Sequence, residues 1–157
     1  MQNSQSPTIQ NLEAAFAGES MAHIKYRYFA KLARAAGDAA TARVFEETAE
    51  QEVQHAFGHL DLLYPRADLS PARALEIAIE GETFEYSEMY PKFRHLALEE
   101  GNSAAVSEFG QQIAESKEHA QNFRLTLEKA AKRFAALAKV EERHAKQYKA
   151  ALAQAQG

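Results

Sequence analysis

The chain has 157 residues, a length typical of one domain with a real core, and a formal net charge of −4 at pH 7. It contains no cysteine, which excludes disulfides, thiolate metal sites and cysteine-ligated electron-transfer modules on this polypeptide. The sequence shows no basic stripe, long apolar run or signal segment, so we expect no binding to nucleic acid or membrane and a cytoplasmic location. Alanine, glutamate, lysine, arginine and leucine dominate, which predicts an all-α fold.

Polar residues fill positions 1–8, where we expect a disordered tail, followed by one helical domain over 9–157. An apolar stripe with alternating spacings of three and four residues predicts a first helix over 9–36. Gly37 is typical of a helix end, and Asp38 is typical of the cap that starts the next helix. Two consecutive helices joined by a tight turn are therefore expected.

The second helix is expected over 39–63, where Tyr64 and a proline interrupt the pattern. Ser70 followed by Pro71 is typical of a helix start, so a third helix is expected from there to about residue 100. Pro91 falls inside this third helix. Since proline removes a backbone donor, we expect a kink or a local bulge there.

The last part of the chain leaves two alternatives open. A turn is expected at 101–103, with Ser103 as the cap, and neither glycine nor proline occurs from 111 to 156. One helix of about 50 residues would span roughly 75 Å, which exceeds the length of a small bundle. The other alternative is two helices that meet at a break carrying neither glycine nor proline.

Acidic residues occupy positions on the apolar stripes where leucine or isoleucine would be expected. Glu52 and His55 lie one turn apart on the second stripe, Glu19 lies on the first, and Glu82 and Glu85 lie on the third. A buried carboxylate costs several kcal/mol unless it is paired or bound to a metal ion. A divalent cation is a suitable partner for a Glu and a His one turn apart.

The chain also repeats a motif of Phe, six residues, Glu, two residues and His. Two copies are complete and a third has Ser in place of Glu; they are Phe45/Glu52/His55, Phe134/Glu141/His144 and Phe109/Ser116/His119. Two helices that each supply a Glu, and two that each supply a Glu and a His, form the ligand pattern of paired hard cations in helical bundles. The predicted metal ligands are Glu19, Glu52, His55, Glu82, Glu85, Glu141 and His144.

Which motif completes this metal site is left open by the sequence. Glu141 and His144 keep the full motif, and the prediction favours them. The alternative is Glu115 and His119, because a helix antiparallel to the third would bring His119 level with Glu82 when counted from the turn at 101–103.

Four segments resemble the di-iron domain of the rubrerythrin family; they are residues 11–20, 45–56, 81–91 and 137–145. The resemblance implies a ferritin-like four-helix bundle with an extra or extended C-terminal helix and two iron ions of the Fe–O–Fe type. It implies a peroxidase that reduces hydrogen peroxide to water, with Glu85 and His55 exchanging as ligands of one iron. By the same resemblance, Tyr26 and Tyr90 supply hydroxyls that steady the ligand carboxylates.

Two departures from the family pattern lead to further expectations. The rubredoxin-like tail is absent, so electrons are expected from an external donor protein that is rubredoxin-like or similar. The linker between the second and third helices has about seven residues and reaches roughly 25 Å, which is too short to run back along a bundle. We therefore expect a homodimer that exchanges helix pairs.

Two other functions stay open alongside the peroxidase. The first is a ferroxidase or another iron-handling ferritin-like protein. The second is a helical scaffold with a vestigial metal site, which the Ser116 substitution keeps in consideration. Manganese is the alternative to iron, because carboxylate-rich ligand sets without thiolates suit several hard ions.

Overall fold

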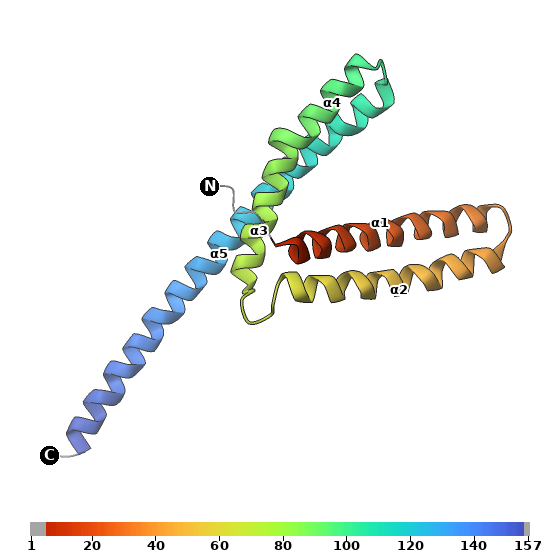
Figure 1. Cartoon of the computed structure of the whole chain (residues 1–157). Helices are drawn as coiled ribbons and strands as arrows, with labels where there is room; N and C mark the ends of the chain where they lie inside the picture. The colour runs from red at the N-terminus through yellow and green to blue at the C-terminus, as the bar shows by residue number, and fades with distance from the viewer. Residues whose placement is uncertain (1–5, 156–157) are drawn as a thin grey trace. The chain divides into compact units, whose positions relative to one another are not determined.

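The computed structural model describes residues 6–155, and within this range every regular element is helical. The order is α1 (Pro7–Ala35), α2 (Ala39–Leu63), α3 (Pro71–Phe84), the π-helical turn η1 (Glu85–Met89), α4 (Tyr90–Glu99) and α5 (Ser103–Ala155) (Figure 1). The all-α prediction is confirmed. The elements form two compact units, one ending at Leu69 and one beginning at Ser70, and each is described by itself. That 9–157 form one bundle stays a prediction.

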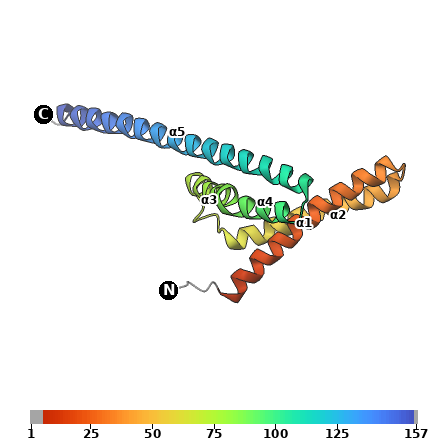
Figure 2. The same cartoon turned by 90° about the horizontal axis from the view of Figure 1, so that it is seen from above.

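The first unit is an antiparallel hairpin of α1 and α2 (Figures 1 and 2). Helix α1 begins at Pro7, before the expected position 9, because Ser6 caps it and accepts a hydrogen bond from the Ile9 N–H at 3.3 Å. The expected tail over 1–8 therefore loses Pro7 and Thr8 to the helix, while residues 1–5 lie outside the described range. Asp38 caps α2 as predicted and accepts from the Thr41 N–H at 2.9 Å.

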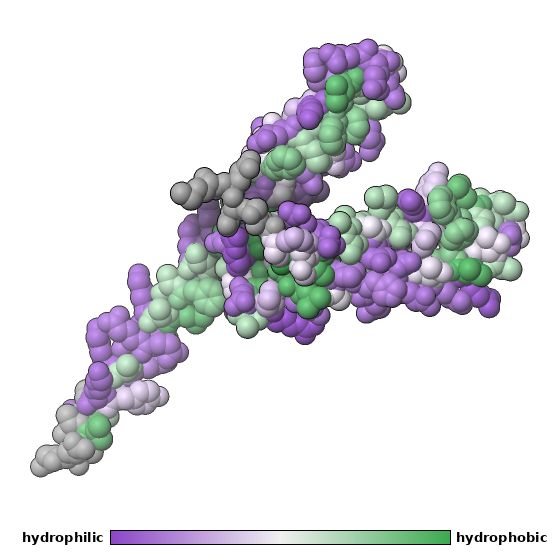
Figure 3. Space-filling view, in the orientation of Figure 1, coloured by the Kyte–Doolittle hydropathy of each residue, from purple (hydrophilic) through white to green (hydrophobic). Residues whose placement is uncertain are grey.

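Small residues are the most buried ones at the contact between α1 and α2. The buried core of this unit, within the described residues, consists of alanines: Ala30, Ala42, Ala49 and Ala56. His23 reaches across the hairpin and lies with Nδ1 2.7 Å from the Ala49 carbonyl oxygen, as a donor in the matching tautomer. Close packing of small side chains leaves large apolar side chains uncovered, including Ile24 and Leu62. Figure 3 shows hydrophobic residues, in green, on the surface of the hairpin.

The turn between α1 and α2 depends on Gly37, whose φ of +81° is strained for any residue with a Cβ. We expect Gly37→Ala to destabilise the hairpin by about 1 kcal/mol, measured as a lower urea midpoint. Gly58 is the matched control, because it lies inside α2 and a Cβ added there meets nothing within 4 Å. Gly58→Ala should stabilise by about 0.5–1 kcal/mol. Equal shifts in both variants would contradict this account.

In the second unit, the interrupted helix α3–η1–α4 packs antiparallel to α5 (Figure 1). The Tyr90 N–H bonds to the Glu85 carbonyl, five residues back, which defines the π-turn just before Pro91. The expected bulge near Pro91 is therefore confirmed, and it lies at a predicted metal ligand.

Helix α5 is one continuous helix of 53 residues, so the long-helix alternative holds over the described range. Its first half packs against α3, η1 and α4, and its second half continues alone past the start of α3 (Figure 2). Ala97, Ala120 and Ser116 are the buried residues of this unit within the described range. None of the described helices combines the length and hydrophobicity needed to cross a membrane.

Candidate metal centre

The first unit brings three predicted ligands together. Glu19 of α1 and Glu52 and His55 of α2 each offer a ligand atom, and these atoms lie within 4.8 Å of one another. His55 Nδ1 lies 2.9 Å from Glu52 Oε2, and the Glu52 side chain is only 16% exposed. Within the hairpin the His23 bond to the Ala49 carbonyl helps to hold α1 beside α2 at this level. Two carboxylates and an imidazole at this spacing suit a hard divalent cation.

The second unit pairs Glu82 and Glu85 with residues of α5. His119 Nδ1 lies 3.4 Å from Glu82 Oε1, and the Ser116 hydroxyl donates to Glu85 Oε2 at 2.9 Å. The Glu82 side chain is 21% exposed, and its Oε2 is buried with no hydrogen-bond partner among the described residues. An unpartnered buried carboxylate oxygen is costly, and a cation would satisfy it. The residues of both units therefore fit a metal.

The structure places the two candidate motifs for the remaining metal ligands, Glu115/His119 and Glu141/His144, at different distances from Glu82. His119 is next to Glu82, whereas Glu115 is exposed. Glu141 and His144 lie on α5 roughly 33–38 Å beyond His119 along the helix axis, and both are exposed. The role of Glu141 and His144 in this centre stays a prediction.

The two predicted tyrosines both pack against phenylalanine rings. The Tyr26 ring lies 6.0 Å from the Phe45 ring, and the Tyr90 ring stacks on Phe109 at 6.1 Å between centroids. Burial, and then the negative charges of Glu85 and Glu82, raise the pKa of Tyr90 above its usual value. The Tyr90 hydroxyl therefore keeps its proton at neutral pH and can donate a hydrogen bond.

Sequence reasoning missed one polar contact beside the second set. Arg124 of α5 donates from Nη2 to the Thr83 hydroxyl at 2.9 Å. Hydrogen bonds from Arg124, and then from Thr83, lower the pKa of Tyr86. Arg124 lies eight residues, about two helical turns, after Ser116 on α5, and this spacing was the signal that could have revealed the contact.

The described residues form helices, with carboxylate and imidazole groups placed between them. This arrangement is typical of helical proteins that bind metal ions through carboxylates. A family model described as rubrerythrin matches residues 10–127. Nigerythrin of Nitratidesulfovibrio vulgaris is 37% identical over 128 residues, covering 74% of this chain and 63% of that protein. Rubrerythrin of Porphyromonas gingivalis is 36% identical over 129 residues, covering 75% and 64%. The chain belongs to the rubrerythrin family, as its motifs predicted.

A solved structure titled as the fully reduced, all-ferrous state of nigerythrin is 35% identical and covers 83% of this chain and 70% of its own. Its TM-score is 0.41, which is too low for a structural comparison, so the family assignment depends on the sequence matches. The chain spans less than two thirds of the length of the nigerythrin and rubrerythrin named above. The family membership, and the carboxylate and imidazole groups of the structure, support iron binding.

Proposed function

We propose that this protein is a non-haem di-iron peroxidase that reduces hydrogen peroxide to water in defence against oxidative stress. The observation that carries the proposal is the Glu82/Glu85 pair, which adds a carboxylate one turn after the first and leaves Glu82 Oε2 buried and unpartnered. Held by the proposed ligands, two ferrous ions would supply the two electrons that, with two protons, convert one hydrogen peroxide molecule to two waters.

The proposed ligands come from both units. Glu19, Glu52 and His55 form one set, and Glu82 and Glu85 form the other. His119 is favoured here as the imidazole of the second set because of its distance to Glu82, while Glu141 and His144 keep their place as the sequence-based alternative. Tyr26 and Tyr90 are proposed as positioning residues, and the protonated Tyr90 hydroxyl can donate a hydrogen bond to a ligand carboxylate.

Reducing equivalents are proposed to come from a separate donor protein, rubredoxin-like or similar, because this sequence has no cysteine to hold an iron–sulfur centre. A helix-swapped homodimer is also proposed. Supporting it, the linker over 64–70 is short, and each unit leaves large apolar side chains exposed, among them Leu32 and Phe84. A cytoplasmic location is part of the same proposal.

Rapid mixing of the reduced, iron-loaded protein with oxidant tests the reaction. We expect peroxide to reoxidise the ferrous centre at least about tenfold faster than oxygen at equal concentration, followed by optical absorbance of the ferric product. The variant Glu85→Gln should lose this preference, whereas Glu88→Gln on the same turn should keep it. Faster reoxidation by oxygen, together with a many-subunit assembly in light scattering, would favour an iron-handling ferroxidase instead.

A further inference from the structure

Helix α5 carries an unbroken stripe of residues at spacings of four and three, which runs past the packed part of the second unit. The stripe is Phe123, Leu127, Ala130, Phe134, Leu137, Glu141, His144, Tyr148 and Ala151. Up to Ala130 these side chains are half-buried, while Phe134 is 69% and Tyr148 is 75% exposed. The spacing is the heptad pattern by which helices pair in coiled coils. This exposed stretch also lies beyond the family match at 10–127.

Glu141 and His144 occupy two consecutive core positions of this heptad pattern, between Leu137 and Tyr148. His144 Nδ1 lies 3.7 Å from Glu141 Oε2, and their side chains are 50% and 76% exposed. A carboxylate at a coiled-coil core position is unfavourable unless a partner neutralises it. The same two residue types at the same spacing occur in the Glu52/His55 set.

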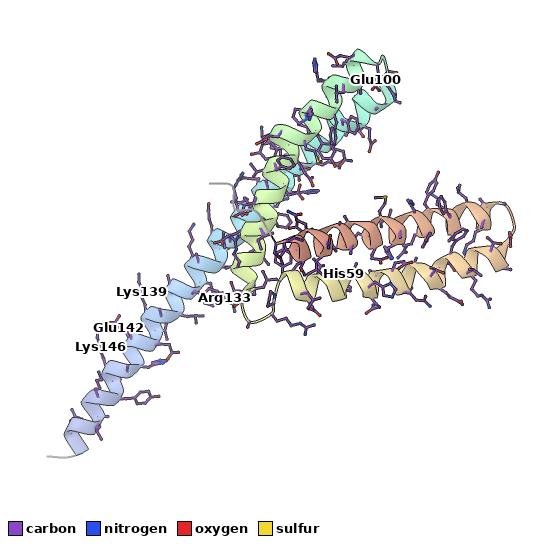
Figure 4. All side chains as sticks on the ribbon, viewed as in Figure 1. His59, Glu100, Arg133, Lys139, Glu142 and Lys146 are labelled. Carbon is purple, nitrogen blue, oxygen red and sulfur yellow. The ribbon has the colours of Figure 1, made fainter. Side chains whose placement is uncertain are left out.

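The other charges of this stretch lie away from the stripe. Lys139, Glu142 and Lys146 project from the same side of α5 (Figure 4). The positions that flank the stripe within 131–152 are almost all uncharged, and Arg133 is the one cation; they are Ala131, Arg133, Ala138, Val140, Ala145, Gln147 and Leu152. An identical helix laid on the stripe therefore meets no opposing row of like charges. This charge pattern favours a second copy of the chain as the occupant.

We propose that residues 130–152 of α5 pair in parallel with the same stretch of a second chain, and that Glu141 and His144 of both chains bind one divalent transition-metal ion. In a parallel pair, each core residue faces its own copy, so two carboxylates lie one turn from two imidazoles. Without a cation the two carboxylates repel each other, and about three heptads form only a marginal coiled coil. The pairing is therefore metal-dependent. This site is separate from the proposed peroxidase centre and does not depend on that function.

Spin labels on single cysteines test this pairing in the full-length protein, because the chain has no cysteine of its own. Lys132→Cys and Lys146→Cys carry the label on the outer face, in two separate samples, and zinc is the metal probe. We expect one short distance between labels, equal at both positions, that appears with zinc and is lost with EDTA. The double variant Glu141→Gln/His144→Gln should abolish it, and the matched outer-face variant Glu142→Gln should keep it.

Zinc analysis of the unlabelled protein gives a second readout. The double variant should bind about half a zinc ion fewer per chain than the parent protein, since two chains share one ion. Three outcomes would overturn the proposal: no distance with zinc, a distance that persists in EDTA, or unequal distances at the two positions, which indicate antiparallel helices. A loss of most zinc in the double variant would overturn it too, because Glu141 and His144 would then belong to the main centre.

Discussion

Glu52→Gln should remove most of the iron from the protein, with an affinity about a hundredfold lower or more. Glu52 is the central member of the first ligand set, since its carboxylate contacts His55 at 2.9 Å and lies within 4.8 Å of a Glu19 ligand atom. Glutamine keeps the shape of the side chain but removes its charge. Iron per chain, measured by elemental analysis after loading with ferrous iron, gives the direct readout.

The thermal midpoint is a second readout, and the expected effect of Glu52→Gln on it differs between metal-free and iron-loaded protein. In metal-free protein, Glu52→Gln removes a mostly buried charge beside Glu19, so the midpoint should stay equal or rise by a few degrees. In iron-loaded protein the stabilisation by ligand binding should largely disappear. Glu47→Gln, an exposed carboxylate on the same helix, is the control and should change neither value. Full iron content in Glu52→Gln would contradict the ligand assignment.

The helix bounds could be read from local chemistry. Gly37 with Asp38, and Ser70 with Pro71, set the ends of the first three helices because each acts on backbone groups within one turn. Pro91 predicted a kink or bulge for a similar local reason, because proline removes a backbone donor from the helix. The start of α1 was misplaced by two residues, because the polar composition of 1–8 outweighed Ser6 and Pro7, whose cap is itself a local signal.

The proximity of Glu19, Glu52 and His55 was also predictable, because Glu52 and His55 lie one turn apart on the apolar stripe of α2 and Glu19 lies on the apolar stripe of α1. Their role as metal ligands stays a prediction. The residues of α5 that lie beside Glu82 and Glu85 were less predictable. The register of α5 against α3 depends on packing across the hairpin, and sequence spacing favoured the fuller motif at Glu141 over the pairing of His119 with Glu82. No local sequence pattern predicts the hydrogen bond from the Ser116 hydroxyl to Glu85.

Ser116→Glu should lower the stability of the metal-free protein and raise its affinity for iron. Ser116 is 3% exposed and its hydroxyl donates to Glu85 Oε2 at 2.9 Å. A carboxylate at this position loses that bond and repels Glu85, which should cost about 1–3 kcal/mol without metal. It also restores the Glu-x-x-His spacing with His119, which adds a ligand where the repeated motif has one.

Iron binding should reverse the penalty of Ser116→Glu, because a cation between Glu85 and the new carboxylate turns their repulsion into shared coordination. We expect about a tenfold gain in iron affinity by competition with a chelator, and a larger rise in thermal midpoint on loading than in the parent protein. Ser116→Ala separates the lost hydrogen bond from the added charge, and exposed Ser107→Glu on the same helix controls for charge alone. If Ser116→Glu weakens iron binding as much as Ser116→Ala does, position 116 does not face the metal. The second ligand set is then complete with the serine, whose hydroxyl serves to hold Glu85 in place.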